Sequence, residues 1–163
     1  MIRKSRILSM MLVFLFLFAF STQVLAQAIT FPDIQDAKWD WARPIIEDMS
    51  IRGYIAGYDD GTFGPSRPVT KIQSLILLAR IMGVNENSNK DYVNLAEKVY
   101  ISDLQQYNTP YKKEISYLLY KNILKKSELD TYLSKKAMDE PLKRYEAAIL
   151  FTKAMGKEEE VKQ

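Results

Sequence analysis

The feature that most constrains the fold of this chain is an internal repeat. The segment PLKRYEAAILFTKAMG at residues 141–156 aligns with PVTKIQSLILLARIMG at residues 68–83, at an offset of 73 residues. Both segments begin with proline, carry a basic residue at the fourth position (Lys71 and Arg144) and end in Met-Gly. Self-similarity of this kind indicates one supersecondary unit that is used more than once. We therefore expect two related helix-loop-helix units.

Apolar residues recur every three or four positions over residues 41–53 and again over residues 70–83. This period predicts two amphipathic helices. Asp40 is expected to be the N-cap of the first helix. Thr70, followed three residues later by Gln73, is expected to form a capping box at the start of the second. The repeat and the helical period together predict an all-α fold, in which the helix-loop-helix repeats pack as a small bundle.

The loop between the two predicted helices reads GYDDGTFGP at residues 57–65. Its Asp60-Gly61 pair favours a tight two-residue turn with positive φ, so the loop is expected to be a miniature hairpin. The rings of Tyr58 and Phe63 are expected to pack against the two helices. In the second unit this loop is replaced by KKSELDTYLSKKAMDE, so only the first unit is expected to contain the hairpin-like loop.

The N-terminal segment has the features of a signal peptide. Three basic residues precede an apolar run from Ile7 to Phe20, and small residues follow up to Ala26. The run has 14 residues, fewer than the roughly 20 that a membrane-spanning helix needs. We expect residues 1–26 to be a signal peptide that is cleaved after Ala26. The alternative is an uncleaved anchor, which would be the chain's one contact with the membrane.

Composition excludes several classes of function. Cysteine and histidine are absent, so thiolate catalysis, histidine bases and Cys/His zinc sites are all excluded. The adjacent Asp59 and Asp60 lack the converging geometry of a carboxylate pair, so neither an enzyme nor a metal or cofactor site is expected. The chain has 23 basic and 20 acidic residues, and the expected signal peptide holds three of the bases and no acid. The remainder is neutral, which argues against nucleic-acid binding.

Four motifs occur in a characteristic order: FPDI, then WA, then GYDDGTFGP, then an apolar helix ending in RIMG. In this order and spacing they resemble the surface-layer homology (SLH) domain of bacterial envelope proteins. The resemblance covers residues 31–83 as a first SLH-like repeat and residues 101–156 as a degenerate second repeat. Residues 84–100 are expected to form a linker helix, and residues 157–163 a charged tail.

The resemblance implies a secreted protein that binds non-covalently to the bacterial cell wall, through anionic, often pyruvylated, secondary cell-wall polysaccharide. The family's ligand-facing arginine at the second helix start corresponds to Lys71 in the first copy and Arg144 in the second. Tyr58, Asp60 and Gln73 are further candidate ligand contacts, although loop packing or helix capping would also explain them. Because a guanidinium grips a carboxylate better than an ammonium does, Arg144→Ala is expected to weaken binding more than Lys71→Ala.

An alternative function remains open at this stage. The chain could be an SLH-derived structural or interaction protein of the envelope, one that has lost polysaccharide binding and contacts a protein partner. The change from arginine to lysine at residue 71 and the replaced second loop favour this alternative. Two copies also leave helix faces uncovered, which would allow self-association.

Overall fold

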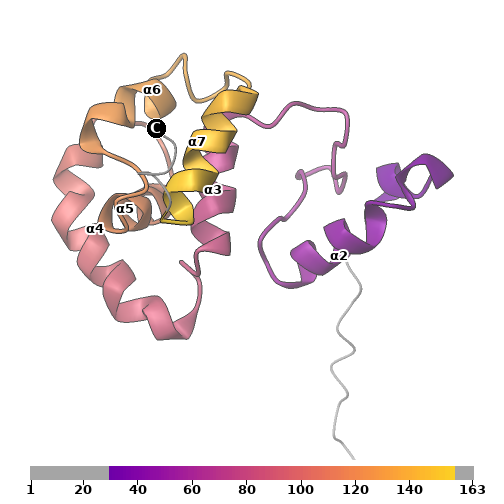
Figure 1. Ribbon diagram of the computed structural model, residues 1–163, viewed down its shortest axis with the longest axis horizontal. Coiled ribbons are helices and arrows are strands. Elements are labelled where there is room, and N and C mark those ends of the chain that lie inside the picture. Colours follow the sequence, from indigo (N-terminus) through magenta and orange to yellow (C-terminus); the bar gives the residue numbers. More distant parts are fainter. Residues whose placement is uncertain (1–29, 157–163) are drawn as a thin grey trace, which may run out of the picture.

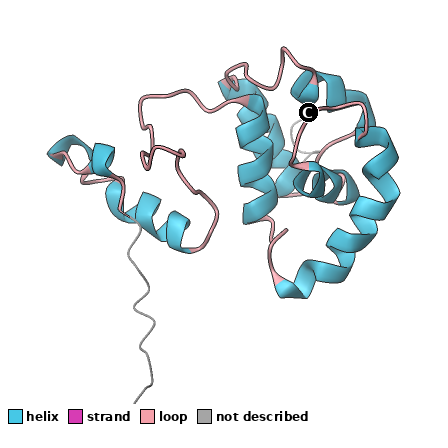
Figure 2. Ribbon diagram, turned by 180° about the vertical axis from the view of Figure 1, so that it is seen from behind, coloured by secondary structure: helices cyan, strands magenta, loops and turns pink. Residues whose placement is uncertain are grey.

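The computed structural model describes residues 30–156, which form helices and loops with no β-strand among them (Figures 1 and 2). The predicted all-α fold is confirmed. An isolated antiparallel bridge joins Thr70 to Pro141. Within these described residues, no helix is both long and apolar enough to cross a membrane. The expected signal peptide (residues 1–26) and charged tail (residues 157–163) lie outside the described residues.

The elements follow one another along the chain in a simple order. The α-helices are α2 (Arg43–Ile51), α3 (Lys71–Ile81), α4 (Lys90–Leu104), α5 (Lys112–Tyr120), α6 (Leu129–Leu133) and α7 (Arg144–Ala154). Short 3-10 helices lie at Pro32–Ile34, Ala37–Trp39, Asn87–Asn89 and Lys126–Glu128.

Helices α3 to α7 form a bundle around one hydrophobic core (Figure 1). Helix α5 lies at its centre and contacts both α4 and α3. All residues of α5 from Ile115 to Leu119 are buried, whereas α4 buries one face, through Val93, Ala96 and Leu104. Burial of such apolar side chains supplies the main stabilisation of a helical bundle.

Helix α2 lies apart from this bundle (Figure 1). It packs on a separate small core made by Phe31, Ile34, Ala42 and Ile46, with the rings of Trp39 and Phe63 against it. We call residues 30–65 the N-terminal unit. The repeat in the sequence did not predict this separation, because a helical period shows that a helix has an apolar face but not what covers that face.

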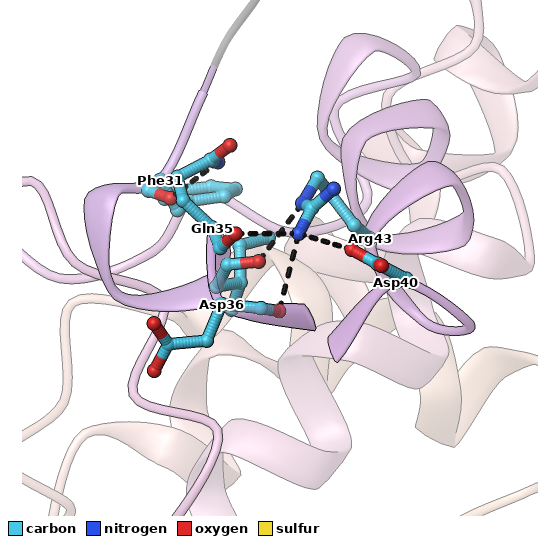
Figure 3. A network of polar contacts seen from close by, with 6 residues as sticks. Phe31, Gln35, Asp36, Asp40 and Arg43 are labelled. Carbon is cyan, nitrogen blue, oxygen red and sulfur yellow. Dashed lines mark hydrogen bonds and ion pairs between the residues drawn. The ribbon is translucent and has the colours of Figure 1, made fainter. Parts of the chain in front are cut away.

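Arg43 ties the start of the N-terminal unit to α2 (Figure 3). Its Nε donates a hydrogen bond to the Ile34 carbonyl at 2.9 Å, and Nη2 donates to the Gln35 carbonyl at 2.8 Å. Nη2 also pairs with the Asp40 carboxylate at 2.7 Å. The prediction that Asp40 is the N-cap of this helix was wrong, since α2 begins at Arg43 after an Ala42 N-cap without a side-chain bond. The ion pair with Arg43 occupies the carboxylate instead.

The start of α3 is capped as predicted. Thr70 Oγ1 accepts a hydrogen bond from the Gln73 N–H at 3.3 Å, and Gln73 Oε1 accepts from the Thr70 N–H at 3.0 Å. In α7 the Glu146 carboxylate accepts from the Lys143 N–H at 2.8 Å, so half of this arrangement recurs at the start of the helix that aligns with α3. Each such bond satisfies a backbone donor that the helix leaves without an internal partner.

The GYDDGTFGP loop is closed by two backbone hydrogen bonds, from Gly61 N–H to the Tyr58 carbonyl at 2.9 Å and from Tyr58 N–H to the Thr62 carbonyl at 2.8 Å. This is a three-residue loop, so the predicted two-residue turn was wrong. Gly61 has φ 79°, whereas Asp60 does not have positive φ. The Asp60 carboxylate accepts from the Thr62 N–H at 2.9 Å and from its hydroxyl at 2.6 Å, which stabilises this alternative turn.

Of the two aromatic rings of the loop, Phe63 packs as expected against a core that includes Ile46 of α2. Phe63 packs against Phe31, with ring centroids 5.6 Å apart, and Tyr58 lies under the Arg67 guanidinium. The loop is held to the N-terminal segment by Asp33, whose carboxylate accepts from the Phe63 N–H at 2.9 Å and the Gly64 N–H at 2.7 Å. Although burial opposes it, these two hydrogen bonds hold the pKa of Asp33 below its ordinary value.

Candidate functional site

A cavity of about 360 Å³ lies between the GYDDGTFGP loop and α3. Its aromatic lining residues are Tyr54, Tyr58, Phe63 and Tyr111. Its charged lining residues are Arg67 and Arg80, and no acidic side chain is among the lining residues. Cavities of this size hold small ligands or single sugar units. The lining favours a ligand that is negatively charged and has an apolar face.

Arg67 stands at the loop side of the cavity. Its guanidinium lies over the Tyr58 ring, 4.3 Å from the ring centroid, and 3.7 Å from the Asp60 carboxylate. The side chain is 53% exposed. A guanidinium has five N–H donors, and a single exposed ion pair at this distance leaves most of them available.

Arg80 stands at the helix side of the cavity. Its Nη1 donates to the Tyr54 carbonyl at 3.3 Å, and Nε is buried without a hydrogen-bond partner among the described residues. Sequence reasoning missed Arg67 and Arg80 as candidate contacts. Arg80 could have been predicted from the helical period. Arg80 follows Gln73 by seven residues and therefore lies on the same face of α3.

The five residues predicted to contact a ligand do not all line the same cavity. Tyr58 and Gln73 line the cavity with the two arginines. Asp60 does not line it, and its carboxylate is engaged by Thr62. The Thr62 hydroxyl and N–H lower the pKa of Asp60. The geometry thus gives Asp60 a role in closing the loop.

Lys71 is buried, with 8% of its surface exposed. Its Nζ donates to the Glu140 carboxylate at 2.9 Å and lies 3.7 Å from the Glu146 carboxylate. The Lys71 N–H also donates to the Glu140 carbonyl at 2.9 Å. Lys71 therefore connects the start of α3 to the start of α7. The hydrogen bond to Glu140 raises the pKa of Lys71, so the ammonium stays charged.

Acid should weaken this connection. The hydrogen bond from Lys71 holds the pKa of Glu140 below its ordinary value of 4.5. A carboxylate with a lowered folded-state pKa contributes stability that is present above the unfolded value and is lost as pH falls through the folded value. The melting temperature should therefore fall as the pH drops below 4.5, and Glu140→Gln should flatten that fall when melting is followed by circular dichroism. An unchanged slope in the variant would contradict this role.

Arg144 is exposed at the start of α7, and its guanidinium has no ion pair or hydrogen bond within residues 30–156. It lines a second cavity, of about 370 Å³, between α3 and α7. The other lining residues are mainly apolar. The two cavities share Pro68, Val69 and Leu77, so they are neighbours on the surface. Arg144 therefore lies next to the arginine-lined cavity, whereas Lys71, its counterpart in the first repeat, lines neither cavity.

Residues 30–73 match the S-layer homology domain family. The resemblance inferred from the sequence is confirmed for this segment, which includes the whole N-terminal unit and the start of α3. The match does not extend to the expected second repeat, so the division into two copies stays a prediction. No solved structure matches the chain significantly.

Known relatives of the chain are large surface proteins and enzymes. The chain is 37% identical to cell surface glycoprotein 1 of Acetivibrio thermocellus over 54 residues, which are 33% of this chain and 2% of that protein. It is 36% identical to an endoglucanase of a Bacillus species over 67 residues, 41% of this chain and 7% of the enzyme. It is 30% identical to an S-layer protein of Bacillus licheniformis over 88 residues, 51% of this chain and 10% of that protein.

The aligned segments thus span at most a tenth of these relatives, which is the size of a module rather than of a whole protein. The S-layer homology domain is a module for attachment, and the endoglucanase shares only this small part with the chain. The matches point to a non-catalytic module at the bacterial cell surface.

Proposed function

We propose that this chain attaches to the bacterial cell wall by binding anionic, often pyruvylated, secondary cell-wall polysaccharide. The observation that carries the proposal is the cavity beneath the GYDDGTFGP loop, whose charged lining residues are both arginines. The loop belongs to the segment that matches the S-layer homology domain. The same segment therefore contains the family signature and most of the residues around the cavity.

The chemistry of the cavity suits an acidic sugar. Arg67 and Arg80 can each donate two parallel hydrogen bonds to a carboxylate, such as that of a pyruvyl group. Tyr58 and Tyr111 also line the cavity, and their rings and hydroxyl groups suit the apolar faces and hydroxyl groups of a sugar ring. Gln73 adds an amide that lines the same space.

A polymer needs a path longer than one cavity. Arg144 supplies a third guanidinium beyond the shared residues Pro68 and Val69. We propose that successive anionic groups occupy the arginine-lined cavity and then the position of Arg144. Lys71 has no part in this path, because two carboxylates already surround its ammonium.

The test is sedimentation of the protein with purified cell-wall sacculi, before and after the secondary polymer is removed with hydrofluoric acid. Binding should require the polymer and should weaken with added salt. Arg67→Gln should reduce affinity about tenfold or more, the range expected for hydrogen bonds to a charged ligand group. Arg52→Gln is the matched control, since this exposed arginine is paired with Asp48 and lies outside the cavity.

Three results would count against the proposal: binding to stripped sacculi, no binding to either preparation, or equal loss in the Arg67 and Arg52 variants. Absence of binding to either preparation would instead favour the alternative, a structural or interaction protein of the envelope that contacts a protein partner.

A further inference from the structure

Arg67, the more exposed of the two arginines that line the cavity, is held in place from several sides. Its side chain is 53% exposed. An arginine with that exposure normally samples many rotamers, and fixing one of them when a ligand binds costs free energy. Contacts that hold the guanidinium in place beforehand remove part of that cost, so they strengthen binding without touching the ligand.

The Tyr58 ring supports one face of the Arg67 guanidinium, whose Cζ lies 4.3 Å from the ring centroid. Gly64 leaves room for this stack. A Cβ at Gly64 would lie 2.5 Å from Cε2 of Tyr58 and 3.0 Å from Cδ of Arg67, so a larger residue would press on both side chains. The Arg67 N–H also donates to the Gly64 carbonyl at 2.9 Å, which fixes the backbone at the same place. The loop therefore has the shape that the stacked arginine needs.

The two oxygens of the Asp60 carboxylate have different partners. Oδ1 accepts from the Thr62 N–H at 2.9 Å and from the Thr62 hydroxyl at 2.6 Å. Oδ2 lies 3.7 Å from Nη2 of Arg67. Because Thr62 fixes the carboxylate through one oxygen, the other oxygen faces the guanidinium in a set orientation. Asp60 thus lies at the edge of the guanidinium whose face rests on Tyr58.

We propose that Asp60 is a positioning residue of the polysaccharide site, because it holds the Arg67 guanidinium on the Tyr58 ring, ready to meet an anionic sugar in the cavity. This inference rests on the proposed function of the cavity. It gives Asp60, which does not line the cavity, an effect on binding opposite to that of its charge. A carboxylate near the site repels an anionic ligand, so without a positioning role its removal should strengthen binding.

The test is sedimentation of variants of the full chain, expressed in a bacterial host and purified as processed there, with sacculi that carry the secondary polymer. Asp60→Asn keeps Oδ1 as an acceptor for Thr62, so the loop stays closed, but it removes the charge that faces Arg67. This variant should bind about threefold more weakly, the effect expected of one exposed ion pair.

Asp59→Asn is the matched control. Asp59 is the neighbouring carboxylate, is exposed, and makes no ion pair or hydrogen bond within residues 30–156. The substitution removes the same charge from the same loop, so this variant should bind as tightly as the wild type or more tightly. The two variants should therefore change affinity in different directions, or only Asp60→Asn should change it. Equal changes in both would overturn the proposal.

A double-mutant cycle separates positioning of Arg67 from a general effect on the loop. In the Arg67→Gln background, Asp60→Asn should weaken binding no further, because the side chain that Asp60 holds is already gone. The same threefold loss in both backgrounds would overturn the proposal. Unchanged or tighter binding of the single Asp60→Asn variant would do so as well.

A second measurement reports the position of Arg67 without any ligand. Protons held over the face of an aromatic ring are shielded, so NMR should find the side-chain protons of Arg67 shifted upfield in the wild type and in Asp59→Asn. The upfield shift should shrink in Asp60→Asn. An equal shift in all three proteins would overturn the proposal, whatever the sacculi bind. The expected shifts in a wild type that fails to bind sacculi would instead contradict the proposed function alone.

Discussion

Replacing Lys71 with alanine should lower the free energy of unfolding of the helical bundle by about 3 kcal/mol, as expected when one partner of a buried ion pair is removed. Glu146 is 7% exposed and would be left beside Glu140 without its cation. Chemical denaturation followed by circular dichroism measures the loss. Lys71→Met, which keeps the apolar part of the side chain but removes the charge, should be destabilised as well.

The matched control for this prediction is Arg144→Ala, at the position that aligns with Lys71 in the sequence. Because Arg144 is exposed and unpaired within the described residues, its loss should change stability by no more than about 0.5 kcal/mol. The same variant should bind sacculi more weakly. Equal stability of the Lys71 and Arg144 variants would contradict the structural role of Lys71, and loss of binding only in Lys71→Ala would contradict the binding role of Arg144.

Gly57→Ala should destabilise the N-terminal unit by about 3 kcal/mol. Gly57 has φ 73°, and a Cβ there would lie 2.5 Å from Cε1 of Phe31 and 2.7 Å from the Thr62 carbonyl oxygen. The carbonyl belongs to the backbone of the loop, so it cannot move away without breaking the bond that it accepts from Tyr58. Both tryptophans of the chain, Trp39 and Trp41, lie in this unit, so tryptophan fluorescence during denaturation reports on it directly.

Gly61→Ala tests the cost of backbone strain in the absence of a steric clash. Gly61 has a similar φ of 79°, but a Cβ there would meet nothing within 4 Å. Only the cost of the left-handed conformation remains, about 1 kcal/mol. If the Gly61 variant were destabilised as much as the Gly57 variant, close packing around residue 57 would not be the cause.

The structure also gives the family signature a physical meaning. The aspartate of FPDI, Asp33, accepts hydrogen bonds from the backbone of Phe63 and Gly64, and Phe31 packs on the Phe63 ring. The first motif and the loop motif are therefore two halves of one small structure. That structure forms one wall of the arginine-lined cavity through Phe63 and Gly64.

The features that could be read from the sequence are those set within a few residues of each other. The capping box of Thr70 and Gln73 was predicted correctly because both bonds join residues three positions apart. The all-α fold followed from apolar periodicity, which reports on a single helix. The prediction for Asp40 was wrong because Arg43 pairs with its carboxylate. The predicted two-residue turn was wrong because the Asp60 carboxylate accepts hydrogen bonds from the Thr62 N–H and hydroxyl, which stabilises a three-residue loop instead.

The sequence by itself determined the helices, the repeat and the resemblance to the S-layer homology domain. Only the tertiary structure decided what each repeat-related residue does. Lys71 and Arg144 occupy equivalent positions in the sequence alignment. In the structure, Lys71 is buried and donates a hydrogen bond to Glu140, a residue 69 positions away, whereas Arg144 is exposed. Contacts at that separation depend on how the helices pack, and the packing of α3 and α7 differs because, among residues 30–156, a helix follows and covers α3 but none follows α7.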